Sequence, residues 1–467
     1  MRLLAIDFGT SNTVAAVRGA DGRARPLLFD GSPLLPSAVC LDPGGTPLTG
    51  RDASRAARLD PARFEPAPKR RIDDGAVLLG DREVPVTELV GAVLRRVSAE
   101  AYRQLGGVDE VRLTHPARWG ERRRTVLVAA ARAAGLPPPR LVAEPVAAAA
   151  YYPAVLGTVL PPGRSLAVYD LGGGTFDAAV VRRTADGFDV LAESGLTDLG
   201  GLDFDQALVE HLGRGYAGGR TELWHGLLSP ADAGQRRARE LLYDDVRAAK
   251  ELLSRAASAE LHLPALDLRA HLTRDELESL IRRQLQQTVN CLARTIAAAR
   301  LDPADLVGIF LVGGSSRIPL AARLIHAELG VAPTTLEQPE TVVAEGALRL
   351  DDPPARPAPV PSPGPARAGS ARDGSAPARA GSARDGSAPA RAGSARDGSA
   401  PARAVAPLRP APAQPEWPAP ARPGQPGAQP AGRFWTGTAG LVWTGTLALL
   451  VVAALVVLVA VLAAGPG

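Results

Sequence analysis

The sequence predicts an α/β fold with two related halves over residues 1–350. Apolar, β-rich runs alternate with helical patterns in this part: strands are expected at 3–6, 167–169 and 309–312, and a helix at 236–259. Two glycine-rich segments of the same design lie about 160 residues apart, which indicates a duplicated fold. After residue 350 the composition changes to Pro, Ala, Gly, Ser and Arg, which cannot fill a core.

Charge distribution and cysteine spacing exclude some classes of protein. The 467 residues suffice for two or three domains. The net charge of +4 is uneven, because residues 353–433 carry 11 Arg against four acidic residues, which leaves residues 1–352 slightly acidic. A nucleic-acid-binding protein would show a basic domain, so no nucleic-acid partner is expected. Cys40 and Cys291 form no spacing motif, and we expect buried free thiols in a reducing compartment.

The first element is a β-hairpin with the sequence IDFGTSNTV at 6–14. An acid ends its first strand, a tight turn follows, and a second apolar strand begins. A glycine lets backbone N–H groups approach a phosphate closely, and hydroxyls add donors. The acid can hold a hydrated Mg²⁺. The candidate residues of this hairpin are Asp7, Gly9, Thr10, Ser11 and Asn12.

A second hairpin, YDLGGGTFD at 169–177, repeats this order. One such hairpin could be an ordinary turn, but two related copies predict that phosphates are clamped between two halves. The sequence contains no GxxxxGK[ST], so a P-loop is excluded. The candidates here are Asp170, Gly172, Gly173, Gly174 and Thr175.

A third glycine turn, LVGGSSRIP at 311–319, follows an apolar strand and opens a helical pattern. A nucleoside could lie against its backbone, with the Arg317 guanidinium stacked on the base. Its other candidates are Gly313, Gly314 and Ser315.

Five motifs, in order, resemble the ATPase domain of the DnaK-type 70-kDa heat-shock chaperones: IDFGTSN, LVAEPVAAA, YDLGGGTFD, LGGLDFD and LVGGSSRIP. The resemblance covers residues 1–350. It implies an actin-like two-lobe ATPase fold, in which each lobe has a sheet of the same topology and ATP with Mg²⁺ lies in the cleft.

The resemblance also assigns roles. Asp7 and Asp170 would hold Mg²⁺ through water, Lys69 would be the catalytic lysine, and Glu144, in a Glu-Pro turn, would lie beside the attacking water. Thr10, Ser11 and Thr175 would contact phosphates, and backbone donors would come from 172–174 and 200–201. The full set of implied catalytic residues is Lys69, Glu144, Asp170 and Thr175; the further nucleotide-binding residues are Gly200, Gly201, Lys250, Ser254 and Glu340.

Lysine is rare in this chain: Lys69 and Lys250 are its two lysines. Because a compact ammonium and a planar guanidinium are not interchangeable, both positions merit a specific role. Lys250 and Ser254 match the family's ribose positions. The sequence departs nearby, since Arg247 stands where the family usually has Glu, and Glu251 where a basic or apolar side chain often covers the adenine. Both departures fall among the family's nucleoside contacts.

The C-terminal part predicts a tether and an anchor. Residues 351–433 form a linker expected to be disordered, with three copies of ARAGSARDGSAP beginning at 366, 378 and 390. We expect one transmembrane helix at 434–464, whose 441–464 run is apolar, followed by a short tail at 465–467. The apolar run before Asp7 is too short for a signal peptide, and arginines precede the span, so the N-terminal domain is expected in the cytoplasm.

These observations predict a single-pass cell-membrane protein: a membrane-tethered, Mg-ATP-binding, slowly hydrolysing chaperone-like ATPase that lacks the peptide-binding domain. Its partners would be ATP and ADP, anionic lipid near the linker, and a protein at the envelope. The main alternative is a non-enzymatic ATP-dependent sensor that recruits such a partner. A small-acceptor kinase and a filament-forming protein, both known in the actin-like superfamily, also remain open.

Overall fold

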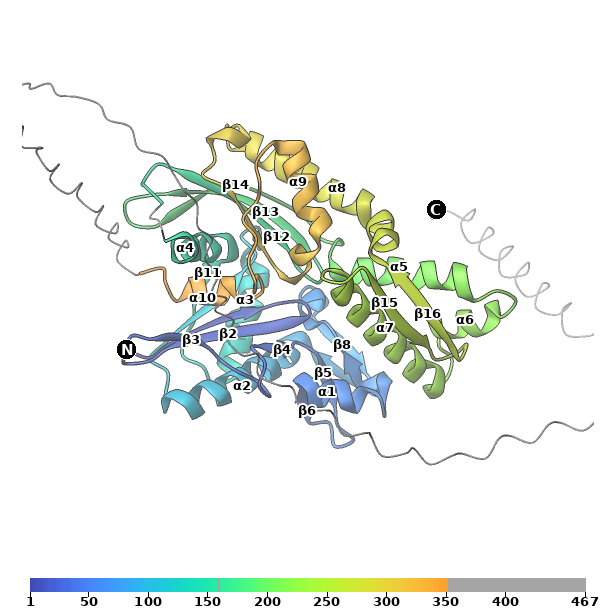
Figure 1. The fold of residues 1–467 in the computed structure, drawn as a ribbon. Coiled ribbons are helices and arrows are strands. Elements are labelled where there is room, and N and C mark those ends of the chain that lie inside the picture. Colours follow the sequence, from blue (N-terminus) through green and yellow to red (C-terminus); the bar gives the residue numbers. More distant parts are fainter. Residues whose placement is uncertain (158–159, 352–467) are drawn as a thin grey trace, which may run out of the picture. The chain divides into compact units, whose positions relative to one another are not determined.

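A computed structural model describes residues 1–157 and 160–351 (Figure 1). The predicted linker, apart from its first residue, and the predicted transmembrane helix and tail lie outside the described residues. Within the described ranges, no helix combines the length and apolar character needed to cross a bilayer.

The first lobe is built on a six-stranded sheet. Its order is β11-β10-β1-β2-β3, with β4 also paired to β2. β1 and β2 are antiparallel, with Asp7 opposite Val14, and β10 runs parallel to β1. The predicted first hairpin is therefore confirmed. The strands are β1 (Leu3–Phe8), β2 (Asn12–Arg18), β3 (Ala24–Pro26), β4 (Leu34–Pro36), β10 (Glu110–His115) and β11 (Arg140–Ala143).

The second lobe repeats this arrangement. Its sheet has the order β14-β13-β12-β17, with β12 antiparallel to β13 and parallel to β17. Phe310 also forms an isolated parallel bridge with Thr334, at the position that β11 takes in the first lobe. This duplicated sheet fits the predicted actin-like fold. The strands are β12 (Ser165–Leu171), β13 (Phe176–Arg183), β14 (Phe188–Leu196) and β17 (Ile309–Val312).

Helices cover both faces of each sheet. In β1, Leu4 and Ile6 pack into one core, and Leu3 and Ala5 pack into another. Strands buried on both faces read as continuous apolar runs, which is how these strands were recognised. The core on the far side of the first sheet contains α2 (Val86–Leu105) and α3 (Glu121–Ala133). The core shared by both sheets contains α4 (Glu144–Leu156) and α10 (Val342–Ala347). The core on the far side of the second sheet contains α8 (Arg274–Ala298) and α9 (Pro319–Leu329).

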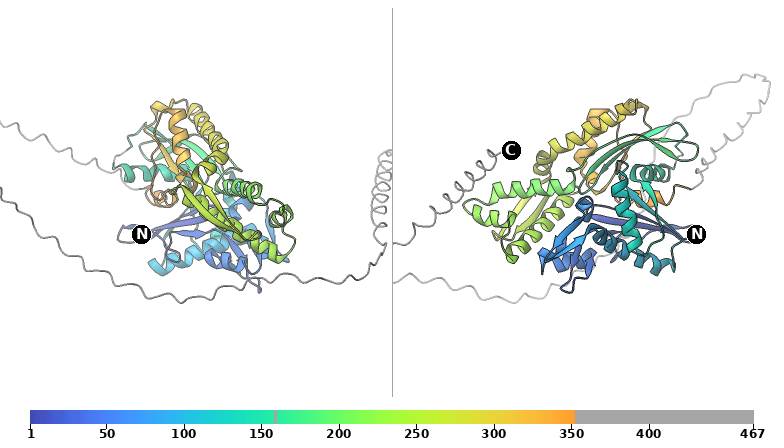
Figure 2. Two further views of the ribbon diagram at one scale, coloured as in Figure 1. Left: turned by 45° about the vertical axis from the view of Figure 1, so that its right-hand side comes forward. Right: turned by 180° about the vertical axis from the view of Figure 1, so that it is seen from behind.

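The helices α4 and α10 lie between the two sheets and join the lobes (Figure 1). The two helices pack closely: a Cβ built at Gly346 of α10 would lie 1.9 Å from the carbonyl oxygen of Ala147 in α4. Figure 2 shows from two further directions that the blue elements of the first lobe lie on one side and the yellow and orange α8 and α9 on the other.

Smaller elements complete each lobe. The first lobe adds α1 (Gly50–Ala57), the strands β5 (Val39–Leu41), β6 (Pro47–Thr49) and β7 (Phe64–Glu65), and the hairpin of β8 (Ala76–Leu79) and β9 (Arg82–Pro85). The second adds α5 (Gly201–Tyr216), α6 (Thr221–Leu228), α7 (Ala233–Leu253), β15 (Ser258–Leu263) and β16 (Leu268–Thr273). Short 3₁₀ helices lie at Pro61–Arg63, Pro68–Arg71, Pro303–Asp305 and Gly314–Arg317.

Two local expectations need correction. The helix predicted to run to residue 259 ends at Leu253, because from Ser258 onward exposure alternates along the strand β15. Glu144 was expected in a turn but is the first residue of α4, where the following proline is tolerated because first-turn N–H groups have no helical partner. The cysteines are buried and free, as expected.

Candidate functional site

The two glycine-rich turns meet at the interface of the lobes. A Cβ built at Gly173 would lie 2.2 Å from Oγ of Ser11, and one at Gly174 would lie 2.6 Å from Cγ2 of Thr10. A larger side chain at either position would force Ser11 or Thr10 to move, so the glycines permit this close approach. The predicted convergence of the two hairpins is therefore present in the structure.

A cavity of about 340 Å³ opens beside these turns. Its volume is that of a small-molecule site. It collects residues from both hairpins, the third glycine turn, α4 and α7, which are far apart in the sequence. The sequence-predicted residues that line it are Asp7, Gly9, Thr10, Ser11, Asn12, Lys69, Glu144, Asp170, Gly172, Gly173, Thr175, Gly201, Lys250, Ser254, Gly313, Gly314, Ser315, Arg317 and Glu340.

The backbone N–H groups of Gly200 and Gly201 are already hydrogen-bonded within the protein. They were predicted to donate backbone hydrogen bonds to phosphate. Instead, the Gly200 N–H donates to Asp203 at 2.8 Å, and the Gly201 N–H donates to the carbonyl of Gly172 at 3.0 Å. A Cβ at Gly200 would lie 2.8 Å from the backbone of Gly173, so these glycines seat α5 against the second turn. Of the predicted donors at 172–174, the Gly172 N–H donates to the carbonyl of Thr175 at 3.1 Å, and Gly174 does not line the cavity. The N–H of Gly173, which lines the cavity, makes no hydrogen bond within the described ranges and can serve as a donor to an anion.

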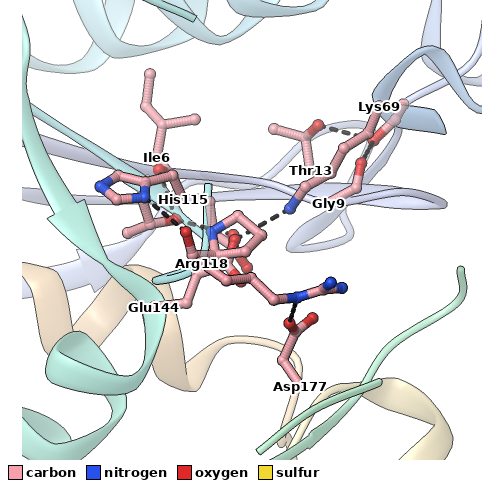
Figure 3. Close-up of polar contacts among 12 residues, drawn as sticks. Ile6, Gly9, Thr13, Lys69, His115, Arg118, Glu144 and Asp177 are labelled. Atoms are coloured by element: carbon pink, nitrogen blue, oxygen red, sulfur yellow. Dashed lines mark hydrogen bonds and ion pairs between the residues drawn. The ribbon is translucent and has the colours of Figure 1, made fainter. Parts of the chain in front are cut away.

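Lys69 and Glu144 form a buried ion pair at the cavity wall. Nζ of Lys69 lies 3.0 Å from Oε1 of Glu144, and both side chains are about nine-tenths buried. Burial raises the pKa of Glu144 to about 7 against the opposing effect of Lys69. Burial alone would lower the pKa of Lys69, but Glu144 and Asp7 raise it. Figure 3 shows the Lys69 ammonium pointing toward Glu144. The ammonium also lies 5.5 Å from the ring centroid of Trp119.

Two strand-end carboxylates face this pair. Asp7 accepts a hydrogen bond from Thr114 at 2.9 Å. Burial raises the pKa of Asp7, and burial together with the charges of Glu144, Asp177 and Asp7 raises that of Asp170 well above its ordinary value. Carboxylates that are costly to ionise together favour a bound cation.

The donor chemistry suits magnesium. Mg²⁺ prefers oxygen ligands and commonly keeps several waters, with one or two carboxylates and substrate phosphates around it. No cluster of three or more metal-ligating side chains occurs in the part of the chain that the structure describes. Asp7 and Asp170 both line the cavity, one from each lobe, and their carboxylates suit the predicted water-mediated binding.

Lys250, predicted to contact the ribose, is held by protein groups. Its ammonium lies 2.7 Å from Oδ1 of Asp205 and donates to the carbonyl of Gly201 at 2.6 Å. Asp205, which also lies 3.6 Å from Nε of Arg247, was not predicted as a site residue. Glu251 lines the cavity, is exposed, and makes no hydrogen bond or ion pair with any described residue.

Arg317 is fixed by two acceptors. Its guanidinium contacts both carboxylate oxygens of Glu340, at 2.7 and 3.2 Å, and donates to the carbonyl of Glu337 at 2.6 Å. The planar guanidinium is thus held in place beside the cavity, and such a group can stack on a flat ligand.

Sequence reasoning missed two arginines that connect the lobes. Arg70 donates to the carbonyl of Gly174 at 3.1 Å and pairs with Asp203 at 3.3 Å. Arg118 pairs with Asp177 at 2.6 Å, as Figure 3 shows. Asp177 closes the YDLGGGTFD motif and lines the cavity, and that motif position was the available signal.

Comparisons with known proteins agree with this geometry. The family model described as "Hsp70 protein" matches residues 75–349. The chain is 31% identical over 357 residues to the "Chaperone protein DnaK" of Thermotoga neapolitana, covering 74% of this chain and 58% of that protein. The same figures apply to the "Chaperone protein DnaK" of Thermotoga maritima. The chain thus spans 58% of the length of these curated relatives.

Proposed function

Because the chain belongs to the Hsp70 family, we propose that it binds ATP with Mg²⁺ in the interlobe cavity and hydrolyses the nucleotide slowly. The observation that carries the proposal is the approach of the two glycine turns, one from each lobe, beside a cavity of about 340 Å³. Backbone N–H groups and hydroxyls that converge from two sides suit a triphosphate better than a neutral ligand.

In the proposed reaction, different residues would bind magnesium, stabilise negative charge and accept a proton. Asp7 and Asp170 hold hydrated Mg²⁺, which when bound offsets phosphate charge. The Lys69 ammonium, oriented by Glu144 at 3.0 Å, stabilises charge that develops on the transferred phosphoryl group. Glu144, whose pKa burial raises to about 7, accepts a proton from water more readily than an ordinary exposed carboxylate.

The proposal extends to the cell membrane. Residues 434–464 would anchor the chain by a single pass, with the nucleotide-binding domain in the cytoplasm. The arginines of the preceding linker would contribute about 1 kcal/mol each where they lie near anionic lipid. The chaperone role proposed here is that of a tethered ATPase which acts on a protein at the envelope.

Phosphate release by the full-length chain tests the enzymatic part. Wild-type protein with Mg-ATP should release phosphate slowly, and Lys69→Ala should reduce the rate by about 10²-fold or more while ATP still binds, because the ammonium acts on the transition state. The substitution Lys69→Arg distinguishes a specific ammonium from a general cation. ATP binding with no release above the Lys69→Ala background would select the sensor alternative, and absence of ATP binding would overturn the proposal.

A further inference from the structure

We infer that Arg118 is a positioning residue, which holds the Asp177 carboxylate at the wall of the nucleotide cavity from the opposite lobe. Arg118 follows β10 of the first lobe, and Asp177 lies near the start of β13 in the second. Nε of Arg118 is 2.6 Å from Oδ1 of Asp177. Because both groups are charged and the bond is short, it is among the stronger hydrogen bonds that proteins form. The inference rests on the function proposed above.

The backbone around this pair leaves space for it. Gly195 of β14 lies opposite Asp177 in the sheet register. A Cβ at Gly195 would lie 2.9 Å from Nε of Arg118 and 2.8 Å from Oδ1 of Asp177. Any side chain at this position would displace one partner, so the absence of a side chain at Gly195 is what lets the guanidinium reach the carboxylate.

Asp177 also stands between two cavities. It lines the nucleotide cavity and a second one of about 20 Å³, which Arg118 lines together with Glu144, Asp170 and Glu193. A space of about that size can hold one water molecule. Asp177, Asp170 and Glu144 would repel one another if left uncompensated, and Arg118 supplies a positive charge on the side away from the nucleotide.

Because Arg118 and Asp177 lie in different lobes, their hydrogen bond depends on the distance between the lobes. A hydrogen bond of this length is lost when its atoms separate by about 1 Å. The Asp177 carboxylate is therefore held in its present orientation only while the lobes keep their present separation. Opening the cleft would release the carboxylate, so Arg118 links lobe closure to the geometry of the phosphate end.

The test is a double-mutant cycle in the full-length chain. We expect Arg118→Ala to lower kcat for phosphate release about 10- to 100-fold, with KM for ATP changed less than about threefold, because a misplaced group costs rate rather than binding. Asp177→Asn should do the same, and the double variant should be no slower than Asp177→Asn, since the two groups act as a unit. Arg118→Lys should restore part of the rate.

Arg2→Ala is the matched control. Arg2 pairs with Asp109 at the same distance of 2.6 Å, outside both cavities. Its substitution by alanine should therefore leave kcat unchanged. If Arg118 had a purely structural role, Arg118→Ala would lower the melting temperature but leave kcat of the folded protein normal, or the effects in the double-mutant cycle would be additive. Either result overturns the inference about Arg118 and leaves the proposed function standing. Absence of phosphate release by the wild-type chain overturns the proposed function and this role with it.

Discussion

Asp170 shows how burial prepares a residue for a ligand. It is the last but one residue of β12, whose other residues are all buried, so its carboxylate shares their low-dielectric surroundings beside the cavity. Its pKa lies well above the ordinary value because of this burial and of three neighbouring acids. An acid in that situation gains more from a bound cation than an exposed one would.

We predict that Asp170→Asn lowers Mg²⁺-dependent turnover by about 10²-fold or more with the fold retained, because the amide cannot replace the anionic oxygen toward hydrated magnesium. Phosphate release over a magnesium titration measures this, and chelation of magnesium should reduce the wild type to a similar rate. Asp109→Asn, at a surface ion pair, is the control. Unchanged turnover in Asp170→Asn would refute the assignment of this carboxylate.

Arg317 supports a second prediction at this scale. Arg317→Ala should weaken ATP binding by about 1 kcal/mol, or roughly fivefold, if the guanidinium stacks on the base. Inorganic tripolyphosphate, which has no base, should bind equally to both proteins. Calorimetry measures both affinities, and Arg323→Ala, which removes an arginine paired with Glu278 outside the cavity, is the control. An equal loss for tripolyphosphate would show that Arg317 acts on phosphate instead.

Among the elements, α4 and α10 determine how the lobes are joined. Both lie in the core that contains residues of both sheets. Gly346 makes their close packing possible, since a methyl group there would lie 1.9 Å from the carbonyl oxygen of Ala147. Backbone atoms cannot give way as flexible side chains can.

We therefore predict that Gly346→Ala lowers the free energy of unfolding by about 1–3 kcal/mol through overpacking. Urea unfolding followed by circular dichroism measures the change. Gly187→Ala is the control, because a Cβ at Gly187 has no atom within 4 Å and should shift stability by less than about 0.5 kcal/mol. Equal stability of Gly346→Ala and wild type would contradict the close packing of α4 and α10.

For the whole molecule, the proposed anchor makes a prediction about location. Deleting residues 434–467 should move the protein from the membrane fraction to the soluble fraction, since the apolar run 441–464 is long enough to span the hydrocarbon core. Deleting residues 366–401 instead removes the three repeats and should leave the protein in the membrane fraction. Fractionation followed by immunodetection measures both. A membrane-bound 434–467 deletion would count against the anchor.

Local chemistry allowed the sequence alone to predict much of this protein. Apolar runs and the three glycine turns are short-range patterns, and they identified the α/β class, the duplication and the cavity-lining residues of those turns. The resemblance to the heat-shock chaperones added Lys69, Glu144, Gly201, Lys250, Ser254 and Glu340. The end of α7 was misplaced because Arg255, Ala256 and Ala257 are helix-favouring residues that lie beyond the end of the helix at Leu253.

Tertiary structure alone decided which charges meet. Lys69 and Glu144 are 75 residues apart, and Arg118 and Asp177 are 59 apart. Lys250 is paired with Asp205, and Arg317 with Glu340, by the same long-range packing. Such pairs carry no periodic signal, because a side chain's partner is set by how sheets and helices stack and not by its neighbours along the chain. The sequence determined the parts of the site, and the stacking of two lobes on α4 and α10 determined their contacts.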